Sequence, residues 1–106
     1  MQNYKRKMKP ALYLISTERV RQVNQEGWTK EHDDTHTHNE LARAAAYYAL
    51  PADWRIIALW TLWPWAREWW KPTPDDRVRE LVKAGALIVA EIERLQRNES
   101  TESSIS

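Results

Sequence analysis

Carboxylates and imidazoles crowd one short stretch, residues 31–40, which reads EHDDTHTHNE and holds every histidine of the protein. His32 and His36 are four residues apart, as are His36 and Glu40, so one turn of helix could aim them at a single ion. Mg²⁺ would prefer carboxylates together with a phosphate. The candidate set for that ion is Asp33, Asp34, Glu40 and Glu91. The alternative is that these acids lie at a helix start and pair with nearby arginines.

A second unusual stretch combines tryptophan with proline and basic residues. The protein has seven Trp, four Tyr and no Phe, and rings with a polar edge are typical of interfaces and ligand sites. Tryptophan faces stack on nucleobases for roughly 1–3 kcal/mol each, and lysine or arginine can hold phosphate. We therefore predict a ligand site formed by Trp63, Trp65, Trp69, Trp70, Lys71, Arg77 and Lys83. The alternative is that most of these tryptophans are core residues, with one or two at a subunit interface.

In so small a fold the two stretches must lie near each other. Trp28, His32, Asp33 and Asp34 are then expected to form the polar wall of the same pocket, opposite an aromatic wall from residues 63–70. In that arrangement the histidine and the aspartates would fix hydroxyl groups of a bound nucleotide.

Composition limits the class of protein. A chain of 106 residues suits one domain with a modest core. Its 16 basic and 15 acidic residues create no global field toward nucleic acid, so nucleic-acid binding ranks last. The lack of cysteine excludes a disulfide framework and Cys-based zinc sites or nucleophiles. No apolar run approaches about 18 residues, and no signal peptide is evident, so we expect a soluble cytoplasmic protein that does not enter a membrane.

The expected organisation is an N-terminal arm (1–15), one helical domain (16–97) and a disordered tail rich in Ser, Thr and Glu (98–106). In the first helix, residues 17–26, Ser16 is the predicted N-cap and Gly27 the stop. Its inward residues are predicted to be Val20 and Val23, with Arg19 and Arg21 on the outer face.

Two more helices are expected before the tryptophan stretch. Thr37 and Glu40 have capping-box spacing, which predicts a helix from His38 to about Leu50, stopped by Pro51. Residues 52–63 are predicted to form a short extra helix with Asp53 as its cap, although an extended segment fits almost as well.

The last helix has the clearest pattern. Prolines at 64, 72 and 74 predict a stiff loop before it. Thr73 is the predicted cap, and the helix should then run to about Arg97. Its inward positions recur at helical spacing: Val78, Leu81, Val82, Gly85, Ile88, Val89, Ile92 and Leu95. Gly85 costs roughly 1 kcal/mol relative to alanine inside a helix, which indicates a close helix crossing there. The fold class predicted is therefore all-α: a small helical bundle with a proline-stiffened, tryptophan-rich loop.

Several segments together resemble a family of short proteins common in tailed phages and prophages. The resemblance covers about residues 16–97 and rests on Trp28-Thr29 with Glu31-His32-Asp33-Asp34, Glu40-Leu41-Ala42, Trp63-Pro64-Trp65, Trp70-Lys71-Pro72 and Leu81-Val82-Lys83-Ala84-Gly85-Ala86-Leu87-Ile88. The family often has glycine where this chain has Asn39, and a shorter link before the tryptophans. The resemblance implies a phage accessory protein and no particular mechanism.

The preferred functional hypothesis is an accessory protein with an anti-defence role that binds and sequesters a nucleotide-type small molecule, as a homo-oligomer in the bacterial cytoplasm. One alternative is a metal-dependent nucleotide pyrophosphohydrolase of the MazG-like type, with Mg²⁺ between Glu40 and Glu91, although its expected Glu-x-x-Glu and Glu-x-x-Asp motifs are absent. Another alternative is an inhibitor that binds a host protein through the tryptophan loop.

Overall fold

The computed structural model describes the backbone of residues 9–105, and the side chains of that range except 56–60 and 101–105. This part of the chain is helical and contains no strand, which confirms the all-α bundle. Its elements are α2 (Ala11–Glu26), α3 (Lys30–Asp33), α4 (Glu40–Ala49), α5 (Ala52–Leu62), the 3₁₀ turn η1 (Arg67–Trp69) and α6 (Arg77–Ile105). Among the described residues, no helix is both long and apolar enough to span a membrane.

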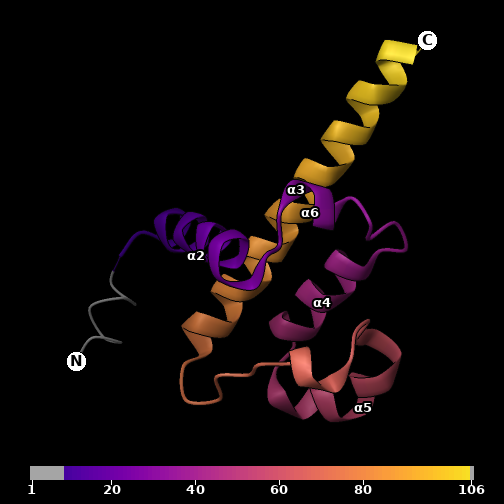
Figure 1. The fold of residues 1–106 in the computed structure, drawn as a ribbon. Helices are drawn as coiled ribbons and strands as arrows, with labels where there is room; N and C mark the ends of the chain where they lie inside the picture. The colour runs from indigo at the N-terminus through magenta and orange to yellow at the C-terminus, as the bar shows by residue number, and fades with distance from the viewer. Residues whose placement is uncertain (1–8, 106) are drawn as a thin grey trace.

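Helix α6 is the central helix of the fold, and α2, α3 and α4 pack against it (Figure 1). Helix α2 crosses it on one side, α4 packs along it on another, and α3 lies against its middle. The core between α4 and α6 is built from small residues around a few large ones: Leu41, Ala44, Ala45, Tyr47, Tyr48, Trp63, Ala84, Leu87 and Ala90. Alanines on the facing sides of the two helices let their backbones approach closely, and this approach places the tyrosines of α4 against the tryptophan loop.

Helix α2 starts earlier and is rotated relative to the prediction. It begins at Ala11, inside the predicted arm, because Pro10 fixes the chain entry and its carbonyl accepts from the amide of Leu14 at 3.1 Å. The predicted stop is confirmed: Gly27 has a left-handed φ of 73°, the conformation that favours glycine. Val20, predicted to face inward, is 56% exposed, while the side chain of Glu18 is buried. The inward face of α2 therefore carries the carboxylate of Glu18 and not Val20. The carboxylate can be buried because arginines from two helices pair with it.

Helix α4 begins two positions after its predicted start, and Thr37 does not cap it. The turn is made by Asn39, whose φ of 66° is left-handed. The Glu40 carboxylate instead accepts from the amide of His38 at 2.6 Å. The helix ends at Ala49, just before Pro51, close to the predicted end. The predicted capping box does not form, because the residue that precedes the helix is the left-handed Asn39 and not Thr37.

The extra helix predicted for residues 52–63 is confirmed as α5. Prolines then keep the tryptophan loop irregular except for η1, as predicted. Trp63 and Trp70 turn back from this loop onto Tyr47 and Tyr48, with ring centroids 4.6–5.8 Å apart. The loop is therefore anchored by two of its own tryptophans.

Helix α6 differs from the prediction at both ends and in its buried face. Asp76, not Thr73, accepts from the amide of Arg79 at 3.1 Å and caps the helix. The helix continues to Ile105, through most of the predicted tail, because neither glycine nor proline interrupts the chain after Gly85. Its last turns project beyond the other helices (Figure 1). Four residues predicted to face inward are instead 43–48% exposed: Leu81, Ile88, Ile92 and Leu95.

Candidate functional site

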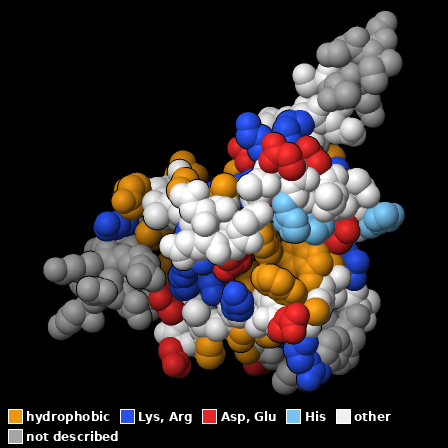
Figure 2. Space-filling view, viewed as in Figure 1, with side chains coloured by type: hydrophobic (Ala, Val, Ile, Leu, Met, Phe, Trp, Pro, Cys, Tyr) orange, Lys and Arg blue, Asp and Glu red, His pale blue; other side chains and the backbone are white. Residues whose placement is uncertain are grey.

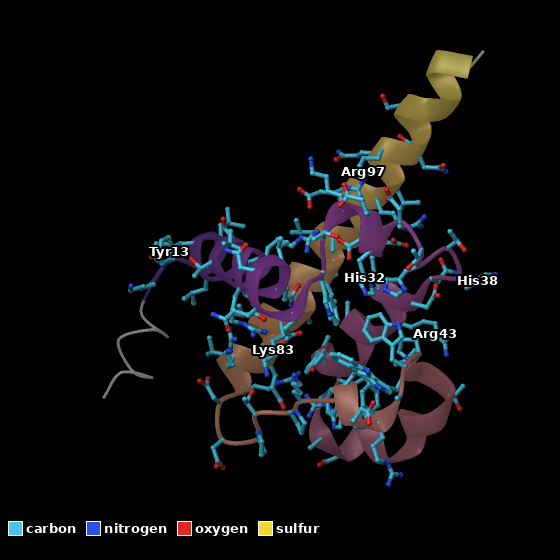
Figure 3. The ribbon with its side chains drawn as sticks, viewed as in Figure 1. Tyr13, His32, His38, Arg43, Lys83 and Arg97 are labelled. Atoms are coloured by element: carbon cyan, nitrogen blue, oxygen red, sulfur yellow. The ribbon has the colours of Figure 1, made fainter. Side chains whose placement is uncertain are left out.

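A hollow of about 280 Å³ opens where the end of α2, α3 and the tryptophan loop meet. We call it the tryptophan–histidine hollow; its lining residues are Glu26, Trp28, His32, His36, Trp65, Ala66 and Trp69. In Figure 2, histidine side chains border an apolar area on this face of the molecule. Figure 3 shows His32 lying over the body of the protein, whereas His38 points away from it.

The rings of the hollow pack against one another in edge-to-face and tilted pairs. Trp28 and Trp65 lie 5.0 Å apart between ring centroids at 71°, and His36 lies 5.2 Å from Trp65. His32 stands perpendicular to His36, with centroids 4.9 Å apart. Burial, together with the nearby His32, lowers the pKa of His36, so its imidazole is neutral around pH 7. These contacts hold the aromatic wall in place before any ligand arrives.

One polar atom in this wall lacks a partner. Within the described part of the chain, the buried indole N–H of Trp65 donates to no protein atom. The equivalent group of Trp63 donates to the carbonyl of Ala66 at 3.1 Å. Buried donors are nearly always paired. The Trp65 N–H is therefore a buried donor that the described protein atoms leave unpaired next to the hollow.

A positively charged side chain, Lys71, lies at one side of the hollow. The ammonium of Lys71 lies 3.8 Å from a carboxylate oxygen of Glu26 and 5.7 Å from the ring centroid of Trp69. Glu26 also accepts from Arg21 at 3.0 Å. Because the Lys71 side chain is about half exposed (56%), its ammonium can move toward an anionic group at the mouth of the hollow.

The aspartates predicted to form the polar wall are held by arginines instead. Asp33 is fully buried, and one of its carboxylate oxygens accepts from Arg19 at 2.6 Å. Burial raises the pKa of Asp33, and the charge of Arg19 opposes that rise. Asp34 pairs with Arg97 of α6 at 2.8 Å. Neither aspartate lines the hollow, but together they fasten α3 to α2 and α6 beneath His32.

Two basic residues predicted to hold phosphate have structural contacts. Arg77 donates to the carbonyls of Tyr48, Ala49 and Leu50, where it closes the C-terminal end of α4. The ammonium of Lys83 donates to the carbonyl of Lys71 at 2.8 Å, and burial lowers its pKa.

The carboxylates suggested for a metal are dispersed among separate partners. Glu91 pairs with Arg94 at 2.7 Å, and Glu40 faces His36 at 3.7 Å. Among the described residues, no group of three or more His, Asp or Glu could hold a metal ion. The alternative that the acids of residues 31–40 pair with nearby arginines holds for Asp33 and Asp34.

Of the predicted site residues, the structure brings Trp28, His32, Trp65 and Trp69 together around the hollow, with Lys71 beside it. It adds Glu26, His36 and Ala66. The four-residue spacing of His32 and His36 was a signal for the second histidine, although the imidazoles meet a tryptophan rather than an ion. Comparisons of the chain with family models, with curated proteins and with solved structures gave no significant match.

Proposed function

We propose that the protein binds a nucleotide-type small molecule in the tryptophan–histidine hollow and holds it without chemical change. The observation that carries the proposal is the meeting of three indoles and two imidazoles around one hollow, with the Trp65 N–H unpaired in its wall. At about 280 Å³ the hollow lies near the lower end of ligand pockets, which start at about 300 Å³. It suits a base rather than a whole dinucleotide.

Each part of a nucleotide has a counterpart at the hollow. A base stacked on an indole face gains roughly 1–3 kcal/mol, whatever its identity. Lys71 is placed to meet a phosphate, and the exposed His32 to meet a sugar hydroxyl.

In its biological setting we propose a phage or prophage accessory protein that acts against host defence by sequestering a nucleotide signal in the bacterial cytoplasm. The resemblance in residues 16–97 supports the setting, and the exposed aromatic hollow supports the binding. A homo-oligomer in which a second copy covers the phosphate side would complete so small a pocket.

A host protein is the second candidate partner. The observation that favours it is Trp69, which is 44% exposed beside the hollow. Exposed tryptophan is typical of binding hot spots. The hydrolase alternative has less support, because Glu40 and Glu91 are paired with different residues.

The test is to titrate purified protein with a panel of cyclic and ADP-ribose-type nucleotides while following tryptophan fluorescence and melting temperature. Trp69→Ala should abolish binding, and Trp54→Ala is the matched control because Trp54 is 61% exposed and lies outside the hollow. Ligand released intact on heating supports sequestration, whereas magnesium-dependent product supports hydrolysis. If no nucleotide changes either signal, the proposal fails and recovery of a host protein that depends on Trp69 is expected instead.

A further inference from the structure

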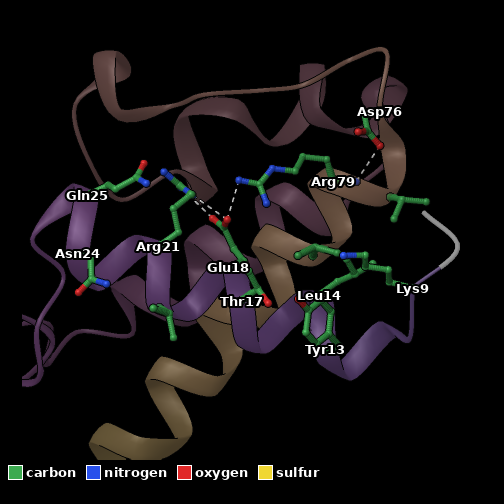
Figure 4. A pocket seen from close by; sticks show the side chains of 13 residues that line it. Lys9, Tyr13, Leu14, Thr17, Glu18, Arg21, Asn24, Gln25, Asp76 and Arg79 are labelled. Atoms are coloured by element: carbon green, nitrogen blue, oxygen red, sulfur yellow. Dashed lines mark hydrogen bonds and ion pairs between the residues drawn. The ribbon is translucent and has the colours of Figure 1, made fainter. Parts of the chain in front are cut away.

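A second and larger hollow, about 440 Å³, lies between α2 and the first turns of α6 (Figure 4). It has no described lining residue in common with the tryptophan–histidine hollow. Its volume is within the range of small-molecule sites. None of the functions discussed above uses it.

A buried ionic cluster forms one side of this second hollow. Glu18 is 1% exposed, and its carboxylate accepts from Arg21 at 2.8 Å and pairs with Arg79 at 2.6 Å. Burial by itself would raise the pKa of Glu18, but hydrogen bonds and charges from the two arginines outweigh burial and lower it. The carboxylate therefore stays ionised and fixes both guanidinium groups at the wall (Figure 4).

The charges around this hollow favour an anion. Its basic lining residues are Lys9, Arg21 and Arg79, against two acidic ones, Glu18 and Asp76. Each guanidinium has five N–H donors. Glu18 accepts from both arginines and Glu26 accepts from Arg21 at 3.0 Å, and these bonds take only part of each set. Lys9 is exposed at the rim, with its ammonium 5.2 Å from the ring centroid of Tyr13.

The rest of the lining combines the polar residues Thr17, Asn24 and Gln25 with an apolar group. The apolar members of the lining are Tyr13, Leu14, Val20, Val78 and Val82. A further hollow of about 240 Å³ shares Lys9, Leu14, Val78 and Val82 with it and adds Ala11, Ile15 and Leu81. An apolar group that enters beside the arginines thus has a second apolar recess next to it.

From these features we propose that the hollow between α2 and α6 binds a small amphipathic anion. Its carboxylate or phosphate contacts Arg79, Arg21 and Lys9, and its aliphatic part lies against Tyr13, Val78 and Val82. This site is distinct from the proposed nucleotide site, because the two hollows have no described lining residue in common; the Arg21–Glu26 ion pair lies between them.

The test uses four probes with the same eight-carbon chain: octanoate, octyl phosphate, octylammonium and octanol. Binding to the full chain is measured by calorimetry and by the rise in melting temperature that a ligand of the native state produces. The proposal expects octanoate and octyl phosphate to bind at least tenfold more tightly than octanol, and octylammonium to bind weakest. Equal binding of all four would overturn it, since only apolar contact would then be at work, and so would binding of none.

Two surface substitutions keep the test independent of folding. Lys9→Gln, at the rim, should weaken octanoate about fivefold and leave octanol unchanged. Val20→Glu places a negative charge on the exposed wall and should abolish octanoate binding while the melting temperature of the free protein stays the same. Trp69→Ala should leave octanoate binding intact. Wild-type affinity in Val20→Glu would place the anion elsewhere and refute the site.

Discussion

Arg19 and Asp33 form the ion pair that fixes the base of the tryptophan–histidine hollow, with the guanidinium 2.6 Å from a carboxylate that solvent does not reach. Arg19 also donates to the carbonyl of Trp28 at 3.2 Å. One arginine of α2 therefore holds both the short helix α3, which carries His32, and the loop that carries Trp28. The position of two pocket rings depends on this contact.

Asp33→Ala should destabilise the protein by about 3–5 kcal/mol, because the largely buried Arg19 loses its buried partner and keeps only a longer ion pair, 3.4 Å, with the half-exposed Glu93. Asp34→Ala is the matched control next to it. The Asp34–Arg97 pair is half exposed on the aspartate side, so its loss should cost about 0–1 kcal/mol. Urea unfolding of both variants measures the two free energies. Similar values would show that Asp33 is not the anchor described above.

The tryptophans of the loop should separate into structural and binding residues. Trp70 packs against Tyr47, Tyr48 and Trp63, so Trp70→Ala should cost about 3 kcal/mol or more of unfolding free energy. Trp69→Ala should change stability by less than about 1 kcal/mol, because its ring is already 44% exposed. Thermal unfolding followed by circular dichroism compares them. A stable Trp70→Ala protein would contradict its place in the core.

Asn39 occupies a position that suits glycine. With φ at 66°, a side chain that branches at Cβ should cost about 1–3 kcal/mol, so Asn39→Val should lower the melting temperature clearly. Asn39→Gly should be neutral or slightly stabilising, since glycine adopts this conformation without strain. A harmful glycine would indicate that the asparagine side chain, not the backbone turn, matters here.

Gly85→Ala should test the crossing of α2 over α6. A methyl group at Gly85 would lie 2.7 Å from Cδ1 of Ile15, so this atom must move. We expect the strain to exceed the roughly 1 kcal/mol that alanine gains in helix propensity. In an Ile15→Ala background, which removes Cδ1 and also Cγ1 at 3.0 Å, the same substitution should become stabilising. A double-mutant cycle of melting free energies measures the coupling, and additive effects would argue against the contact.

Glu18 should make stability depend on pH in the acid range. Its pKa is lower in the folded protein than the ordinary value of 4.5, so its contribution is present above about pH 4.5 and is lost as the pH falls through the lowered value. At neutral pH, Glu18→Gln should therefore lower the free energy of unfolding by about 3 kcal/mol, and the melting temperature should fall with it. The difference should shrink on acidification. A difference that stayed constant with pH would mean that the charge of Glu18 contributes nothing.

The sequence by itself determined the local features of the fold. Gly27 ends α2 and Pro51 follows the end of α4, because these residues limit the backbone whatever lies around them. Helical spacing located α6 and favoured a helix at α5 only narrowly over an extended segment, and the prolines located the irregular tryptophan loop. The grouping of aromatic and histidine residues also indicated which segments could form a hollow.

Only the tertiary structure decided which of those side chains the hollow keeps. Trp63 and Trp65 are neighbours in the loop, yet one is core and the other lines the hollow, because the tyrosines of α4 meet only the first. Asp34 is captured by Arg97 from the far end of the chain, a pairing that no local pattern predicts. Burial of charge depends on partners brought together by folding, so residue type and spacing could locate the site but not assign its members.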